Sequence, residues 1–175
     1  MIEWAEHMSL KDNSLNFIFS NSVIEHIPPQ EEVLKEVKRV LKPGGRFLFT
    51  TPSNLFSDYL YLSNKLSQVG LSTLADWYVQ QRNKRLNHYH LYSTKQWEKR
   101  LAKYGMKIDK SCYCVSKSTL QLWDKMALEV VFRKFFDPLA EDQVYQKYES
   151  ELKKHLDEKI IDANGADLVI CAIKK

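Results

Sequence analysis

Two polar segments and one histidine are the strongest candidates for ligand binding and catalysis. Ser20-Asn21-Ser22 follows one phenylalanine-rich run, and Thr50-Thr51-Pro52 follows the next. Ligands of parallel α/β sheets bind beyond the carboxyl ends of the strands, so both segments are predicted to face a ligand. His26 comes shortly after the first segment, and an imidazole is the side chain most often used as a general base. The alternative interpretation is a structural histidine that orients the start of the next helix.

A second group of candidates lies in the middle of the chain. His88 and His90 flank Tyr89, and an extended backbone would place both imidazoles on one side, toward a substrate or a metal. Because the sequence offers no third ligand nearby, we predict no metal site. Cys112 and Cys114 lack the two-residue spacing of zinc knuckles, so we interpret them as buried thiols on a strand.

Other residues have two open interpretations. Thr51 and Tyr59 are predicted to contact a substrate together with the two histidines. Further aromatic side chains of the same stretch either line that pocket or form the core of an added helical layer; they are Tyr61, Trp77 and Tyr92. Glu25 is interpreted as a surface-turn residue that pairs with a neighbouring cation.

A strand, a helix and a second strand must position these groups. Residues 16–20 are rich in aromatic and β-branched side chains, which predicts a buried strand. Residues 31–41 have apolar side chains at helical spacing and charges on the other side, and Pro43-Gly44-Gly45 ends that helix. Residues 46–50 form a second buried strand. This order predicts two parallel strands with a right-handed crossover.

Periodic apolar residues continue through the rest of the chain. Residues 55–80 are predicted to be helical, and 82–92 form a polar, basic loop. Ser93 with Gln96 gives a capping-box pattern before a helix that ends at Gly105.

The C-terminal third is predicted to contain two strands and two helices. A strand covers 106–116, and Ser118 with Gln121 gives a capping pattern before an amphipathic helix. A more polar helix follows to about residue 159, and a final apolar strand covers 168–173.

Composition narrows the class of protein. The 175 residues are 44% hydrophobic and 27% charged, which is typical of one globular domain and excludes a disordered chain. No apolar run approaches the ~20 residues that cross a bilayer. The absence of a signal-peptide pattern and of a disulfide framework favours the cytoplasm.

The positive charge is unevenly distributed. The net charge is +4, yet residues 80–117 alone carry 10 basic and 2 acidic side chains. This segment is either a site for a phosphate, an acidic substrate, nucleic acid or anionic lipid, or a solvated helix face with a loop. Few aromatic residues are spaced between the clustered cations, so nucleic acid is a weak candidate.

The motifs of residues 12–45 resemble the class I S-adenosylmethionine-dependent methyltransferases, in particular the branch acting on small molecules, lipids and quinones. The resemblance is carried by D-N-S-L-N-F-I-F-S-N-S-V-I-E-H-I, then R-V-L-K-P-G-G, a strand and T-T-P. The segment H-Y-H-L-Y-S-T-K-Q-W-E-K-R-L-A-K-Y-G-M-K-I resembles the family's step into strand six. The segment A-D-L-V-I-C-A-I-K-K resembles its antiparallel final strand, which lies between strands five and six.

The resemblance implies an α/β fold that is the C-terminal half of a Rossmann-like methyltransferase sheet. Two parallel strands are joined by a helix, a C-terminal antiparallel strand pair follows, and a helical layer is added. Residues 1–175 then form one partial domain. Its parts are a βαβ core motif (1–54), a helical or lid insertion (55–92), a helix and strand (93–117), a helical insertion (118–165) and the final strand (166–175).

The resemblance also implies methyl transfer from S-adenosylmethionine to a small-molecule or lipid-like acceptor. Ser20, Asn21, Ser22 and Val23 would contact the methionine part of the cofactor. Ala5 and Glu6 would lie near its adenine. His26 would face the acceptor.

Departures from the family pattern qualify this assignment. The chain contains no G-x-G, and Asn16 stands where the family usually carries Asp. We therefore expect a methyltransferase truncated just before the family's strand four, to which residues 16–20 correspond. Such a chain would bind S-adenosylmethionine poorly or not at all by itself. The alternative is a catalytically inactive binding or scaffold module. A nicotinamide oxidoreductase is disfavoured, because the dinucleotide glycine loop is missing as well.

Truncation would leave residues 16–20 as a sheet edge that is apolar on both faces. An unpaired apolar edge recruits another strand. The sequence therefore predicts a homodimer, or strand exchange, that covers this edge.

Overall fold

The two phenylalanine-rich segments lie side by side and point the same way. We analysed a computed structural model that describes residues 4–137, 140–157 and 164–175. In it β1 (Leu15–Asn21) pairs in parallel with β2 (Leu41–Pro52), as predicted. The strand order β1-β2-β4-β3 places β4 (Asp167–Lys174) antiparallel between β2 and β3 (Met106–Cys114). The predicted place of the final strand is therefore confirmed.

The start of β2 differs from the prediction. Residues 43–45 were expected to form a turn before a strand at residue 46, whereas β2 begins at Leu41, which pairs with Leu15. The register then shifts, so that Phe17 pairs with Arg46. Gly44 has a φ of +76°, a left-handed conformation that glycine adopts without steric cost. The Pro-Gly-Gly segment is thus an irregularity inside the strand rather than a turn before it.

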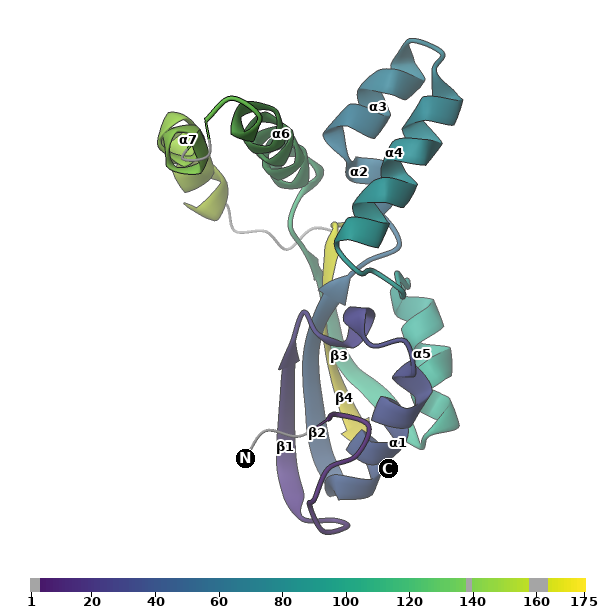
Figure 1. Cartoon of the computed structure of the whole chain (residues 1–175). Helices are drawn as coiled ribbons and strands as arrows, with labels where there is room; N and C mark the ends of the chain where they lie inside the picture. Colours follow the sequence, from purple (N-terminus) through teal and green to yellow (C-terminus); the bar gives the residue numbers. More distant parts are fainter. Residues whose placement is uncertain (1–3, 138–139, 158–163) are drawn as a thin grey trace.

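Two helices cover one face of the sheet (Figure 1). The first is α1 (Gln30–Val40), which buries its apolar stripe and carries Glu31 and Glu32 in its first turn. The second is α5 (Thr94–Lys103), whose N-terminus has the predicted capping box between Ser93 and Gln96. Acidic residues in a first turn and a capping box both stabilise a helix N-terminus.

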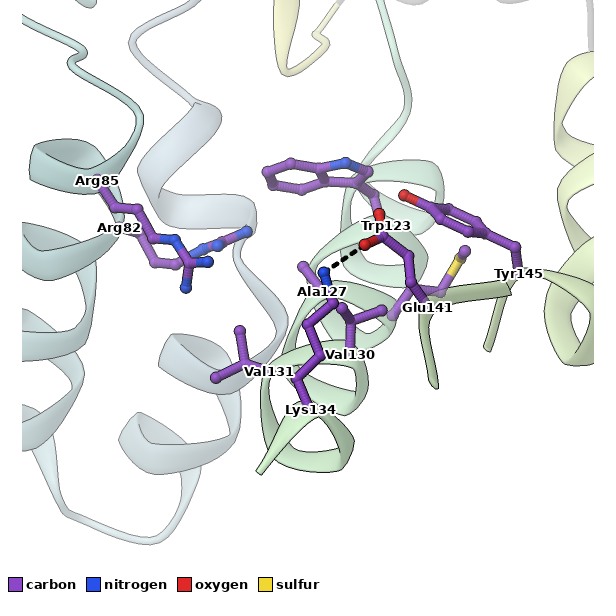
Figure 2. A pocket seen from close by; sticks show the side chains of 10 residues that line it. Arg82, Arg85, Trp123, Ala127, Val130, Val131, Lys134, Glu141 and Tyr145 are labelled. Atoms are coloured by element: carbon purple, nitrogen blue, oxygen red, sulfur yellow. Dashed lines mark hydrogen bonds and ion pairs between the residues drawn. The ribbon is translucent and has the colours of Figure 1, made fainter. Parts of the chain in front are cut away.

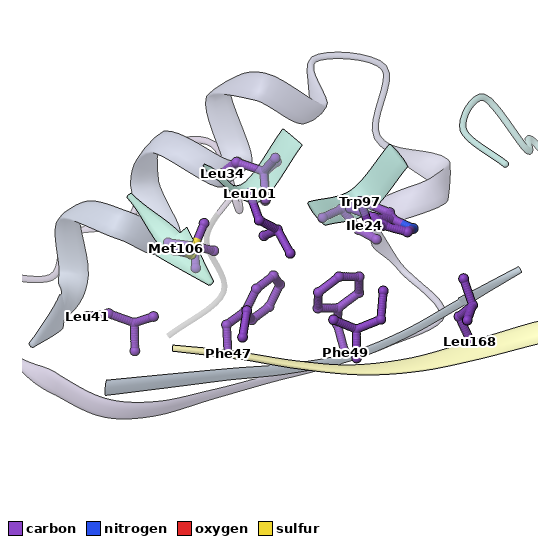
Figure 3. Close-up of a cluster of buried hydrophobic side chains, with 13 residues drawn as sticks. Ile24, Leu34, Leu41, Phe47, Phe49, Trp97, Leu101, Met106 and Leu168 are labelled. Atoms are coloured by element: carbon purple, nitrogen blue, oxygen red, sulfur yellow. The ribbon is translucent and has the colours of Figure 1, made fainter. Parts of the chain in front are cut away.

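The main core lies between this face of the sheet and these two helices (Figure 3). Phe47 and Phe49 project from β2 and are almost completely buried. The Phe49 ring meets the edge of the Trp97 ring at a centroid distance of 4.8 Å. Leu34 from α1 and Leu101 from α5 complete the contact, and both are fully buried. Apolar burial on this scale is the main term that stabilises the sheet.

The opposite face of the sheet lacks such cover within the described residues. Phe17 and Phe19 share that face and are 52% and 58% exposed. Leu48, the partner of Phe19 in β2, and Cys171, the partner of Leu48 in β4, continue the row and are only partly buried. β1 is also the edge strand of the sheet. An open edge therefore adjoins an open, partly apolar face.

A second group of helices stands beyond the carboxyl ends of β1 and β2 (Figure 1). These helices are α2 (Phe56–Tyr59), α3 (Tyr61–Gln68), α4 (Ser72–Arg85), α6 (Lys117–Lys134) and α7 (Ala140–Asp157). None of the helices in the described part of the chain is long and apolar enough to cross a membrane. The group forms the added helical layer.

Several predicted boundaries in this layer were wrong. The single helix expected at 55–80 is three helices, because Leu60 has an extended ψ of 133° and Gly70 has a φ of +80°. α4 continues to Arg85, into the expected loop, and ends with basic residues that suit a helix C-terminus. The cap of α6 is Ser116 rather than Ser118, since its side chain accepts from the Thr119 amide. The predicted end of the last helix, residue 159, lies outside the described residues.

Gly165 is required where the chain enters β4. A Cβ atom at this position would lie 2.4 Å from the carbonyl oxygen of Cys114, which is backbone and cannot rotate away. We expect Gly165→Ala to lower the free energy of unfolding by about 1–3 kcal/mol, the usual cost of overpacking. Thermal unfolding measures this loss, with the exposed Ser67→Ala as a control expected within about 0.5 kcal/mol of wild type. An unchanged midpoint in Gly165→Ala would contradict the close approach.

Candidate functional site

A pocket of about 390 Å³ opens where β1 and β2 end. It is bounded by the 3-10 helix η1 (Ile24–His26), by the helical layer and by the start of β4. Its lining residues are Ser22, Glu25, His26, Pro52, Phe56, Leu86, His88, Val115, Thr119, Leu120, Trp123 and Asp167. The lining is mostly apolar and aromatic with a few polar groups, which is the usual make-up of a small-molecule site.

The end of β1 is fixed by hydrogen bonds to β2. The Thr50 hydroxyl donates to Asn21 Oδ1 at 2.6 Å and accepts from the Ser22 amide at 2.9 Å. Ser22 has a φ of +49°, a left-handed conformation that costs a non-glycine residue of order 1–3 kcal/mol. These bonds hold the strained turn that directs η1 across the pocket.

Glu25, His26 and His88 meet at the wall of the pocket. The His26 Nε2 atom lies 3.6 Å from Glu25 Oε1, and the His26 Nδ1–H donates to the Asn87 carbonyl at 3.2 Å. The His26 and His88 rings stack with centroids 5.5 Å apart. The prediction of an exposed Glu25 was wrong, because this residue is 1% exposed and its backbone carbonyl accepts from the Tyr89 amide at 2.9 Å.

Burial shifts the pKa values of three ionisable side chains of the pocket wall, Glu25, His88 and Asp167. It raises the pKa of Glu25 above its ordinary value. Burial, with the positive charges of His26 and Arg82, lowers the pKa of His88 to about 4, so that this imidazole is neutral at physiological pH. Burial, with the nearby Glu25 carboxylate, raises the pKa of Asp167 to about 6. The pocket wall thus carries titratable groups whose charged forms are disfavoured.

The predicted cofactor residues divide between two pockets. Ala5, Ser20, Asn21 and Val23 line a separate pocket of about 260 Å³, whereas Ser22 lines the larger one. Glu6 lies in the turn in which the His7 amide donates to the Trp4 carbonyl, and it lines neither pocket. The carboxyl end of β1 therefore contributes to both pockets.

The predicted substrate residues are only partly brought together. His88 lines the larger pocket, whereas Thr51 is 1% exposed and lines neither of these two pockets. Tyr59 packs within the helical layer, with Lys117 Nζ 5.6 Å from its ring centroid. His90 is turned away from His88, because its Nε2–H donates to the Ile27 carbonyl at 3.1 Å and its Nδ1 accepts from the Tyr92 hydroxyl.

Sequence reasoning missed two notable members of the site. Asp167 starts the antiparallel strand β4, so it lies beside Pro52, at the end of the sheet where β1 and β2 finish. Its place just before a predicted strand was the available signal. Trp123 belongs to a helix whose apolar stripe looked like ordinary core, and it carried no separate signal.

A third pocket, of about 240 Å³, shares Trp123 with the larger pocket (Figure 2). Arg82 and Arg85 reach from α4 toward α6, where Lys134 pairs with Glu141 of α7. Arg82 is 8% exposed, and its Nε lies 3.0 Å from Asp124 Oδ1. Part of the basic segment at 80–117 is therefore built into the helical layer and is not a solvated face.

The family described as "Methyltransferase domain" matches residues 3–111. The chain belongs to this family. Phosphoethanolamine N-methyltransferase 2 of Caenorhabditis elegans is 42% identical over 40 residues, 23% of this chain and 9% of that protein. Malonyl-[acyl-carrier protein] O-methyltransferase of Alcanivorax borkumensis is 35% identical over 78 residues, 42% of this chain and 26% of that protein.

Solved methyltransferases share the fold. A protein from Galdieria sulphuraria, assigned as a sarcosine dimethylglycine methyltransferase, superimposes with a TM-score of 0.58 at 17% identity, over 99% of this chain and 58% of its own. Phosphoethanolamine N-methyltransferase 2 of Haemonchus contortus, solved with S-adenosylmethionine, superimposes with a TM-score of 0.56 at 21% identity. The superposition covers 97% of this chain and 35% of that protein. The chain thus spans less than two thirds of the length of each of these relatives. The predicted Rossmann-like α/β fold is confirmed.

Proposed function

We propose that this chain takes part in S-adenosylmethionine-dependent methyl transfer to a small-molecule acceptor. The observation that carries the proposal is the pair of pockets at the carboxyl end of β1, one lined by Ser20, Asn21 and Val23 and the other by His26 and His88. In-line methyl transfer requires donor and acceptor at ~3–3.5 Å, which neighbouring pockets permit. The smaller pocket is assigned to the donor side and the larger to the acceptor.

His26 is the proposed base of the acceptor pocket. Its Nδ1–H donates to the Asn87 carbonyl, so the lone pair is on Nε2. A hydroxyl acceptor would lose its proton to this nitrogen as the methyl group arrives. The apolar part of the wall, including Phe56 and Trp123, favours an acceptor with an apolar body. This makes a small or lipid-like molecule the proposed acceptor.

The residues present fit only part of the cofactor. Asn21 and Ser20 offer polar groups to its methionine end, but the 175 residues contain no G-x-G to cradle the rest. The described glycines with left-handed φ are Gly44, Gly70 and Gly105, and none of them follows the end of β1 or β2. We propose that the chain supplies the acceptor-side half of a methyltransferase and depends on a glycine-rich half for full cofactor affinity.

Calorimetric titration tests this division. The chain alone should show no binding of S-adenosylhomocysteine tighter than the millimolar range, and so no methyl transfer. A longer chain in which a strand and a glycine-rich turn precede residue 1 should bind it in the micromolar range. Micromolar binding by the 175 residues alone would overturn the proposed division while leaving methyl transfer intact.

A catalytically inactive binding or scaffold module is the second candidate. The missing G-x-G favours it, because the family uses such a loop to hold its cofactor. The longer chain separates the two functions. Acceptor binding without cofactor binding would favour the module, and turnover would favour the enzyme.

We further propose that a second copy of the chain covers the exposed edge of β1. The edge strand presents unpaired backbone groups, and the adjoining face presents Phe17 and Phe19. Antiparallel pairing of two β1 strands would satisfy the backbone groups and bury these rings in a two-fold interface.

A further inference from the structure

Three potential metal ligands converge on the wall of the larger pocket. One ligand atom from each of Glu25, His26 and His88 can be chosen so that all three lie within 4.8 Å of one another. Two of them come from η1, and the third comes from the loop after α4, so the chain brings together groups more than sixty positions apart. An ion at the centre of such a triangle would reach all three with small side-chain rotations.

The Glu25 carboxylate is the second, independent sign of a ligand. This residue is 1% exposed, and its Oε2 atom has no hydrogen-bond partner in the part of the chain that the structure describes. His88 Nδ1 is also buried without a partner among these residues. Buried polar atoms are almost always paired, because an unpaired one has lost its hydrogen bonds to water without replacement. A bound cation would satisfy the carboxylate and accept the imidazole lone pair.

The surroundings of His26 match those of a metal-ligating histidine. Such a histidine almost always donates its second ring N–H to a carbonyl or carboxylate, which fixes the tautomer and the ring orientation. The His26 Nδ1–H donates to the Asn87 carbonyl at 3.2 Å. The lone pair is therefore on Nε2, which lies 3.6 Å from Glu25 Oε1. The tautomer needed for binding through Nε2 is therefore already selected.

We propose that Glu25, His26 and His88 form a binding site for a divalent transition-metal ion such as Zn²⁺. Two imidazoles and one carboxylate suit Zn²⁺, and three protein ligands leave a fourth position open. All three residues line the 390 Å³ pocket, so the open coordination position would face a molecule bound in that pocket. These three residues were not recognised as a set in the sequence, because His88 was considered together with His90 and not with the residues of η1.

The site assigns a different role to His26 when an ion is bound. A nitrogen that holds a metal cannot also accept a proton, so His26 would be a ligand. The ion would then lower the pKa of an acceptor hydroxyl in place of the base. This consequence rests on the proposed methyl transfer, whereas the metal site itself rests on geometry alone.

Titration with ZnCl₂ tests the site on the untagged chain. Cys112→Ser with Cys114→Ser serves as the background, because Cys112 is exposed and Cys114 is only partly buried, contrary to the predicted burial, and free thiols compete for Zn²⁺. We expect binding of one ion in the micromolar range or tighter. Glu25→Gln and His88→Gln should each weaken it by at least ~100-fold, since even second-shell changes cost ~10–100-fold. His90→Gln is the matched control, because His90 does not line the 390 Å³ pocket and bonds to the Ile27 carbonyl, and it should stay within a few-fold of the background.

Two further measurements keep the test decisive if one variant folds poorly. Circular dichroism without metal identifies such a variant, and Zn²⁺ should protect His26 from diethyl pyrocarbonate in the background chain. Equal affinity of Glu25→Gln, His88→Gln and the background would overturn the proposal, as would the absence of binding to a folded background chain. Neither S-adenosylmethionine nor an acceptor is present, so a failure of the proposed methyl transfer leaves this result unchanged.

Discussion

Replacing Phe17 and Phe19 together by lysine should convert a dimeric chain into a monomer. Both side chains are more than half exposed on the uncovered face of β1, the edge strand of the sheet. Charged edge residues are the device by which natural sheets prevent edge-to-edge pairing. Light scattering coupled to gel filtration measures the result. We expect a mass near twice 20.6 kDa for the wild type and near 20.6 kDa for the variant at the same concentration.

A matched pair of phenylalanines provides the control. Phe135 and Phe136 follow α6 and are 83% and 80% exposed, but they lie in the helical layer. Lysine at both of these positions should leave the dimer intact. A monomeric wild type at high concentration would contradict the proposed pairing, and loss of the dimer in the control would move the interface to α6.

The second large effect is expected from Asp124→Leu, which should lower the free energy of unfolding by about 3–5 kcal/mol. Asp124 is fully buried and accepts from the Tyr78 hydroxyl at 2.6 Å and from the Leu62 amide at 3.3 Å. Its Oδ1 also lies 3.0 Å from Nε of the buried Arg82. Removing one partner of a buried ion pair leaves an uncompensated charge, which is the costly change. Urea unfolding measures the loss.

A double variant separates this charge effect from a simple loss of packing. Arg82→Met combined with Asp124→Leu should be more stable than Asp124→Leu alone, because no buried charge is then left without its partner. Tyr78→Phe removes only one hydrogen bond to a charged group and should cost about 1.5–3 kcal/mol. A double variant that is less stable than the single would contradict the explanation.

The sheet could be predicted from the sequence because its signals are local and strong. The two phenylalanine-rich strands, the helix between them and the capping box at Ser93 each depend on a few adjacent residues. The breaks within 55–80 were harder to predict, since Leu60 takes an extended conformation with no proline or glycine beside it. The start of β2 at Leu41 depends on a long-range pairing with Leu15, which no local pattern encodes.

The candidate site was harder to predict, because it also depends on contacts between distant parts of the sequence. His26 and Ser22 could be placed from the rule for parallel strands, and both line the larger pocket. The burial of Glu25 depends on the loop after α4 folding over it, and the pairing of His26 with His88 joins two distant segments. Tyr59 and His90 have the right chemistry for a substrate contact, but packing in the helical layer and bonds to Ile27 and Tyr92 direct them elsewhere.

Trp123 forms part of the wall of both the 390 Å³ and the 240 Å³ pockets, and the Arg82 guanidinium stacks 4.7 Å from its ring centroid. The two pockets therefore share Trp123 as a lining residue. A ligand that displaced the indole in one pocket would change the lining of the other. A ligand in either pocket should therefore change the emission of Trp123, which is read against the other three tryptophans of the chain, Trp4, Trp77 and Trp97.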